Sequence, residues 1–175
     1  MSSTREFEGA AALEGFPNTW KRVMTDPRGF FAEMPEVGGL QAPLAFLGVT
    51  AVINAAGHLV LGWGLGGFVR IVLWQVFGAF VSAALFVLIA QHLFGGRAGF
   101  EPTFRVVAYA AAPMVLAWLP LRLGVLAVIY GAYLTIVGLE RVHGFDTTRA
   151  VLTVVIGLGV MWLLFVARRR GPLLP

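Results

Sequence analysis

Cysteine is absent and charge is scarce in this 175-residue chain. The lack of cysteine excludes disulfide bonds, thiolate metal sites and a catalytic thiol. Charged residues make up 13% of the sequence and hydrophobic residues 58%, whereas a typical soluble protein is about 25% charged. This composition excludes an ordinary soluble domain and indicates an integral membrane protein.

Motifs for catalysis and for cofactor binding are also missing. No Ser/His/Asp set and no phosphate-binding glycine loop occurs in a recognised spacing. After residue 36 the only carboxylates are Glu101, Glu140 and Asp146, which are too few for a helical di-metal site. The N-terminus shows no basic stretch that leads directly into an apolar core and a cleavage site, so no signal peptide is predicted. We therefore expect a non-enzymatic protein without catalytic residues, metal or cofactor.

Long uncharged runs fill the chain after residue 36. A run of about 18 or more mostly apolar residues is long enough to cross the hydrocarbon core as a helix. The sequence thus predicts an all-α polytopic membrane protein, with a bundle of five transmembrane helices within residues 43–167. The predicted spans are about 43–65, 69–93, 105–121, 123–143 and 147–166.

The third and fourth spans are the least regular of the five. Their uncharged runs, 106–121 and 123–139, are short, and only "LPLR" separates them. Two short spans or one re-entrant hairpin would both fit residues 106–139. We prefer two spans, because non-helical backbone at membrane depth is tolerated only where protein or water covers it. The choice also decides the side of the membrane on which the C-terminus lies.

The cations predict an orientation for this bundle. If the N-terminus is inside, eight cations lie on the inner side and five on the outer side, which agrees with the excess of basic residues in cytoplasmic loops. The chain has one lysine and twelve arginines and is rich in Ala, Gly, Val and Leu, which suggests a GC-rich bacterial genome. We therefore expect a multi-pass protein of the inner (plasma) membrane with a cytoplasmic N-terminus. Its net charge of +4 comes largely from arginines at loop positions and does not indicate nucleic-acid binding.

The segments outside the bundle are short and more polar. Residues 1–15 form an acidic tail that we expect to be flexible, and residues 168–175 form a basic C-terminal tail. Between them, residues 16–42 begin with Phe16, Trp20, Val23 and Met24 on one helical face. This pattern predicts a short interfacial amphipathic helix on the membrane surface. The predicted anchor residues are Trp20, Lys21, Arg22, Phe30 and Phe31.

Polar residues inside the spans are the first candidates for a binding site. They are Asn54, His58, Gln75, Ser82, Tyr109, Tyr130, Tyr133 and Thr135. Asn54 and His58 lie one turn apart on one face, and they either bond to another helix or line a polar cavity. Pro113 follows Tyr109 by four residues, and a proline can kink a span and open a polar site at its middle.

A second polar cluster lies in "ERVHGFDTTR". Glu140 and His143 are three residues apart and could share a cation, with Asp146 and Arg149 close by in sequence. The simpler interpretation is a helix end, a glycine stop, and Asp146 as the N-cap of the last span. A weak metal site or a lipid-headgroup site is the alternative.

Several stretches together resemble the Yip family, membrane proteins whose founding members bind Ypt/Rab GTPases. They are "W…DPRGFF…MP", "GGLQAPLAF", "FRVVAYAAAP" and "YGAYLTIVGLERVHGFDTTRAVL", which cover about residues 20–160. The resemblance implies a five-helix bundle with a cytosolic N-terminus, and it matches Tyr109 and Pro113 to a tyrosine-then-proline element. The aspartate- and tyrosine-rich signature of the eukaryotic members is missing from "EVGGLQAPL", so we do not expect a Rab-type GTPase as partner.

The sequence leaves two functions open. The first is a non-enzymatic membrane protein of the Yip type that organises the membrane, contacts lipid or binds a partner, either a second copy or another membrane protein. The alternative is a small transporter or channel-like protein with a polar site around Asn54, His58, Tyr109 and Pro113. A transporter predicts that these side chains and Tyr130 converge on one hydrated cavity, whereas the first function predicts that they are scattered or bonded in a dry core.

Overall fold

The computed structural model describes residues 12–120 and 123–169, and every regular element in these two ranges is helical. The prediction of an all-α fold is therefore confirmed. Seven α-helices and one 3-10 helix follow one another in this part of the chain: α1 Ala12–Thr25, α2 Pro27–Glu33, α3 Gln41–Val60, α4 Gly64–Phe94, α5 Phe100–Ala110, η2 Ala112–Leu116, α6 Leu123–His143 and α7 Thr147–Arg169.

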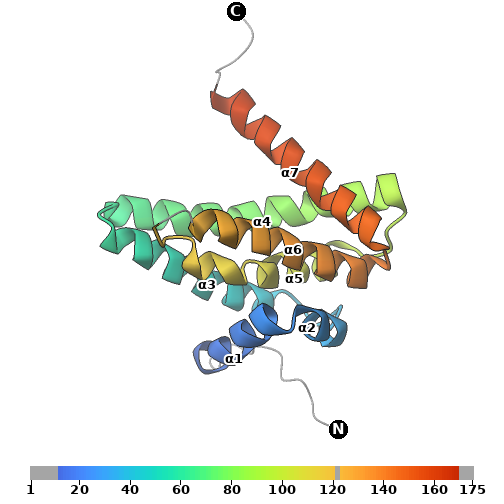
Figure 1. Cartoon of the computed structure of the whole chain (residues 1–175), viewed down its shortest axis with the longest axis horizontal. Coiled ribbons are helices and arrows are strands. Elements are labelled where there is room, and N and C mark those ends of the chain that lie inside the picture. Colours follow the sequence, from blue (N-terminus) through green and yellow to red (C-terminus); the bar gives the residue numbers. More distant parts are fainter. Residues whose placement is uncertain (1–11, 121–122, 170–175) are drawn as a thin grey trace, which may run out of the picture.

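Four of these helices, and not five, are long and apolar enough to cross a membrane. They are α3, α4, α6 and the part of α7 up to Ala167. In Figure 1, α3, α4 and α6 lie side by side with α5. The four candidate spans identify a multi-pass membrane protein, and the prediction of five full-length transmembrane helices is wrong.

The missing span is the one expected at 105–121. Here α5 has only 11 residues and gives way to the 3-10 helix η2. A helix of that length reaches about 16 Å, roughly half of a 30 Å hydrocarbon core. Pro113 stands near the start of η2 and has no backbone N–H to donate to the preceding turn, so the α-helix cannot continue through it. The next predicted span, at 123–143, is present as α6, which has 21 residues and is regular.

Burial explains why α5 is so short and so polar. Thr103, Phe104, Arg105 and Val106 are all fully buried, and α5 contacts α3, α4 and α6. A helix that is covered by protein on every side needs no apolar face for lipid. The non-helical backbone after it is tolerated at membrane depth for the same reason.

The N-terminal helices α1 and α2 lie along one side of the bundle (Figure 1). Val23 and Phe31 are almost completely buried there. Trp20 Nε1 donates a hydrogen bond to the Ala112 carbonyl at 2.8 Å, and Tyr130 Oη donates to the Met24 carbonyl at 2.7 Å. The apolar stripe that was expected to face lipid thus packs against protein. Its place relative to a membrane surface stays a prediction.

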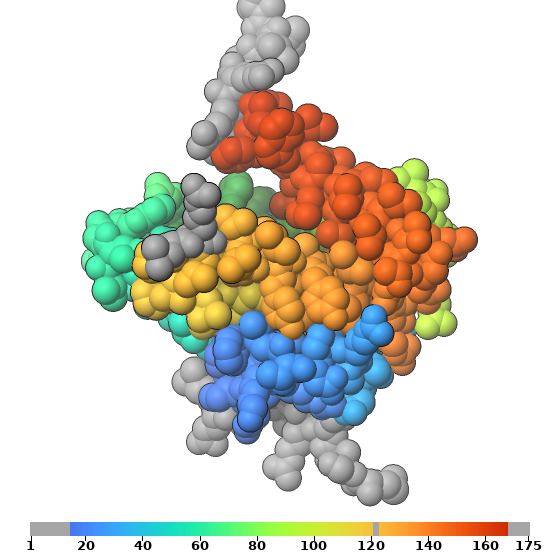
Figure 2. Space-filling model, in the orientation of Figure 1, coloured from blue at the N-terminus to red at the C-terminus, as the bar shows by residue number. Residues whose placement is uncertain are grey.

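Helix α7 leaves the bundle half-way along its length. Its buried residues are Ala150, Thr153, Val154 and Gly157, and no residue from 158 to 167 is buried. Figures 1 and 2 show this second half inclined away from α4 and α6. The side of the bundle that it leaves is therefore open.

We predict that Gly138→Ala destabilises the bundle, because a Cβ at this position would overlap the side chain of the fully buried Val106. The expected loss is about 1–3 kcal/mol of unfolding free energy. Gly78→Ala is the matched control, since nothing lies within 4 Å of its Cβ position. Helix loss on heating in detergent micelles measures both variants, and equal melting temperatures would contradict the close packing of α6 on α5.

A second prediction concerns the docking of α1 and α2. Phe31→Ser removes a ring that is 1% exposed, and loss of a buried aromatic side chain costs about 3–5 kcal/mol. We expect the segment to detach and trypsin to cleave faster after Lys21 and Arg22. Ala32→Ser, on the exposed side of the same helix, should leave cleavage unchanged. Cleavage of both variants at the wild-type rate would show that α2 does not hold the segment in place.

Candidate functional site

A polar network joins α3 to α4 inside the bundle. Asn54 Nδ2 donates to Gln75 Oε1 at 3.1 Å, and Gln75 Nε2 donates to Thr50 Oγ1 at 3.4 Å. The Thr50 hydroxyl in turn donates to the Leu47 carbonyl at 2.7 Å. Bonds of this kind hold transmembrane helices together, so the network acts as a clamp between two spans.

Two further polar atoms lie at this clamp, Asn54 Oδ1 and His58 Nδ1. Asn54 Oδ1 is buried and has no hydrogen-bond donor among the described residues. His58 turns back along its own helix, with Nδ1 3.0 Å from the Asn54 carbonyl oxygen, and packs edge-on against the Trp63 ring. Asn54 and His58 are therefore neighbours, as their spacing predicts, but only Asn54 reaches across to α4.

The other in-span candidates lie elsewhere. Tyr109 is 2% exposed, and its ring packs against Phe30 and Phe46 at centroid distances of 5.0 and 5.1 Å. Tyr130 bonds to α1, and Pro113 is buried in η2. Pro113 and Tyr130 line one apolar cavity of about 250 Å³ together, whereas Asn54, His58 and Tyr109 do not border it.

The predicted anchor residues differ in their burial and in their contacts. Trp20 and Phe30 pack partly against the core, and Phe31 belongs to it. Arg22 pairs with Glu33 of α2 at 2.6 Å, while Lys21 is exposed. The rings of this segment stabilise the fold, and the exposed Lys21 remains available to a headgroup.

The residues of the predicted loop cluster also make separate contacts. Asp146 caps α7, with its Oδ1 accepting from the Arg149 backbone N–H at 3.2 Å, and it lies 3.6 Å from the Arg149 guanidinium. His143 is 3% exposed, with Nε2 3.1 Å from the hydroxyl oxygen of Thr103, and Glu140 lines a shallow depression beside α2. No group of three potential metal ligands occurs among the residues that the structure describes.

Arg105 is a buried charge that the motif analysis did not select. Its Nη2 donates to the Gly39 carbonyl at 2.8 Å and lies 3.5 Å from Glu101 Oε1. The same carboxylate oxygen accepts from the Gly39 N–H at 2.7 Å. Gly39 has a φ of +84°, a conformation that glycine adopts without strain. In the sequence, the spacing of four residues between Glu101 and Arg105 was the available signal for this ion pair. The contacts of the pair with Gly39 join the segment before α3 to α5.

An apolar recess is the largest feature shared by the spans. It has a volume of about 250 Å³ and is bordered by residues of α3, α4, α5, η2, α6 and α7. Small side chains dominate parts of its wall, among them Ala79, Ala110 and Ala132, and Gln75, Ser82 and Thr135 contribute the polar atoms. Val154 and Leu158 of α7 border one side of the recess.

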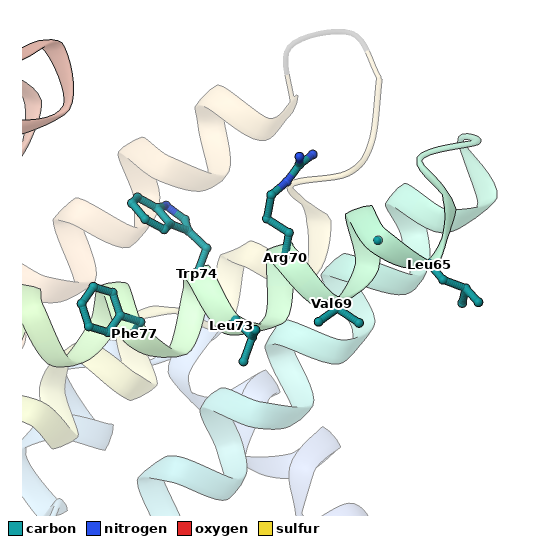
Figure 3. A pocket seen from close by; sticks show the side chains of 7 residues that line it. Leu65, Val69, Arg70, Leu73, Trp74 and Phe77 are labelled. Atoms are coloured by element: carbon teal, nitrogen blue, oxygen red, sulfur yellow. The ribbon is translucent and has the colours of Figure 1, made fainter. Parts of the chain in front are cut away.

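A separate groove runs along the first half of α4. Its volume is about 690 Å³, and its lining consists of Leu65, Gly66, Val69, Arg70, Leu73, Trp74 and Phe77. Figure 3 shows these side chains on α4. The groove and the recess have no lining residue in common.

The comparison with protein families matches the Yip1 domain over residues 21–168. The chain belongs to the Yip1 domain family. Proteins of this family are generally non-enzymatic membrane trafficking proteins. Comparisons of the chain with curated proteins and with solved structures gave no match.

The residues that carry the Yip1 likeness gather where α5 breaks. Trp20 bonds to the Ala112 carbonyl, and Phe30 packs against the Tyr109 ring. Tyr109 lies in the last turn of α5, and Pro113 is the second residue of η2. In this Yip1 domain these residues therefore build the junction between the N-terminal helices and the broken helix, which is a role in folding.

The clamp between α3 and α4 can be tested with a double-mutant cycle. Asn54→Leu and Gln75→Leu each remove one side of the bond, so each should destabilise the domain. The double variant should recover the coupling energy, which averages about 0.6 kcal/mol and reaches about 1.7 kcal/mol for such pairs in membranes. Unfolding free energies in mixed micelles measure the cycle. Strictly additive losses would show that the two side chains do not interact.

Proposed function

We propose that this Yip1 domain is a non-enzymatic module that holds membrane lipid in the recess between α4, α6 and α7. It would act in a bacterial inner membrane, with its N-terminus on the cytoplasmic side. The supporting observation is the apolar recess, which is bordered by all four candidate spans. The proposal involves no Rab-type GTPase and no nucleic acid.

Such a recess does not stay empty in a bilayer. The side chains that line a void lose their dispersion contacts on one side. Water gains little in a wall that is mostly aliphatic, because a buried water needs several polar partners. An acyl chain provides the contacts without requiring hydrogen bonds.

The arrangement of polar side chains argues against the transporter alternative. A carrier needs its polar groups around one site near the middle of the bilayer. Here Asn54 bonds to Gln75, Tyr109 packs among phenylalanines and Tyr130 bonds to α1. These contacts hold the three side chains at separate places among the described residues, so they do not line one polar path.

Ser82→Phe tests the proposal, because Ser82 lines the recess and is partly buried. We expect the wild type to retain phospholipid after mild detergent extraction and the variant to lose it, since the ring fills the recess. Native mass spectrometry measures the bound lipid. Ala84→Phe, on the exposed side of the same helix, should retain lipid as the wild type does.

Equal lipid retention in Ser82→Phe and wild type would overturn the proposal, provided that both melt at the same temperature. Ser82→Leu serves if the larger ring prevents folding. Since the chain has no cysteine, Ser82→Cys also supplies a single thiol. Fast reaction of that thiol with a charged, membrane-impermeant reagent would reveal a water path and favour a transporter.

A further inference from the structure

Helix α4 is longer than a bilayer requires, and Arg70 is its only charged residue. The helix has 31 residues, or about 46 Å at 1.5 Å per residue, against a hydrocarbon core of about 30 Å. Residues 71–90 are uncharged, with Arg70 before them and Gln91 and His92 after them. These 20 residues match the thickness of the core, and we infer from this match that Arg70 lies at the level of the lipid headgroups.

The groove around Arg70 combines this cation with an apolar wall. Leu65, Val69, Leu73, Trp74 and Phe77 are each more than half exposed and line it together with Arg70. Figure 3 shows Arg70 and Trp74, one turn apart, pointing to the same side of α4. An arginine beside a tryptophan at the end of an apolar span is typical of the membrane–water interface.

Arg70 has no carboxylate to neutralise it in the part of the chain that the structure describes. The ion pairs found there involve Arg22, Arg105, Arg141 and Arg149. Glu36 lies before α3, Glu101 in the first turn of α5, Glu140 near the end of α6 and Asp146 just before α7. Arg70 lies at the opposite end of the bundle. A charge next to apolar surface needs a counter-charge or water.

We propose that the α4 groove is a binding site for an anionic phospholipid. The Arg70 guanidinium binds the phosphate, which accepts two parallel N–H bonds from its planar fork. The indole N–H of Trp74 is available to the glycerol or phosphate oxygens. One acyl chain lies along Leu73 and Phe77, toward the middle of the membrane. This site is distinct from the recess and does not depend on the recess being filled.

The charge pattern favours a lipid over a second copy of the chain. Residues 58–70 and 116–120, which lie at this end of the bundle, contain no aspartate or glutamate. Self-association through the groove would bring this cationic end against another of the same sign. A net negative headgroup supplies the missing charge, whereas a zwitterionic headgroup carries its own cation close to the phosphate.

The test uses the purified full-length chain in mild detergent with equal amounts of phosphatidylglycerol and phosphatidylethanolamine. Native mass spectrometry gives the ratio of the two lipids that remain bound. We expect the wild type to prefer phosphatidylglycerol by about fivefold, the factor that one basic residue near an anionic surface contributes. Arg70→Gln should lower this ratio to about one, and Arg70→Lys should retain part of the preference.

Two control variants separate this site from other effects. Arg28→Gln removes an exposed arginine of α2 and should retain the preference for phosphatidylglycerol. An equal loss of this preference in Arg28→Gln and Arg70→Gln would show that only net charge matters, and would overturn the proposal. Ser82→Phe should lose recess lipid and keep the preference, which separates the failure of one site from that of the other. An unchanged ratio in Arg70→Gln overturns the proposal. The proposal is also overturned if the wild type forms a dimer without bound phosphatidylglycerol and this dimer dissociates in Trp74→Ala, since the groove would then be an interface between copies.

Discussion

The break in the polypeptide after α5 is the constraint on which the rest of this Yip1 domain depends. At Pro113 the α-helical ladder cannot continue, and a 3-10 helix follows. Backbone of this kind survives at membrane depth only under a cover of protein. Helices α3, α4 and α6 surround α5, and α1 covers the junction with η2 through the bond from Trp20 to the Ala112 carbonyl. The N-terminal helices are therefore part of the bundle and not an accessory to it.

The same constraint places the buried charge. Arg105 stands on α5 and is fully buried, which would be costly without close partners. It is held by the Gly39 carbonyl and by Glu101, whose carboxylate also accepts the Gly39 N–H. The three groups fix the point at which the chain enters α3 relative to the start of α5. Since α5 offers no apolar face to lipid, an ion pair at its first turns stabilises the domain without disturbing the membrane.

Hydropathy predicted the long helices well, because α3, α4, α6 and α7 each place much of their surface in lipid and must be apolar. It failed for α5, since burial among other helices removes the demand for an apolar run. The stripe of Phe16, Trp20, Val23 and Met24 correctly indicated an amphipathic helix. Periodicity shows only that one face is apolar, however, and cannot tell lipid from protein as its neighbour. The spacing of Asn54 and His58 likewise gave their common face, while the partner Gln75 depends on how α3 meets α4, which no local pattern encodes.

The separation of polar and apolar features bears directly on function. Asn54 and Gln75 join α3 to α4, and Tyr130 joins α6 to α1, so these polar side chains help to hold the bundle together. The open features, by contrast, include the apolar recess and the groove with Arg70, whose linings are mostly apolar. A transporter would require the reverse arrangement, with polar groups around an open path and apolar groups closed. The second half of α7 accentuates the difference, because no residue from 158 to 167 is buried and this half inclines away from α4 and α6. Lipid binding is thus the function that we propose, because it uses the surfaces left free by folding.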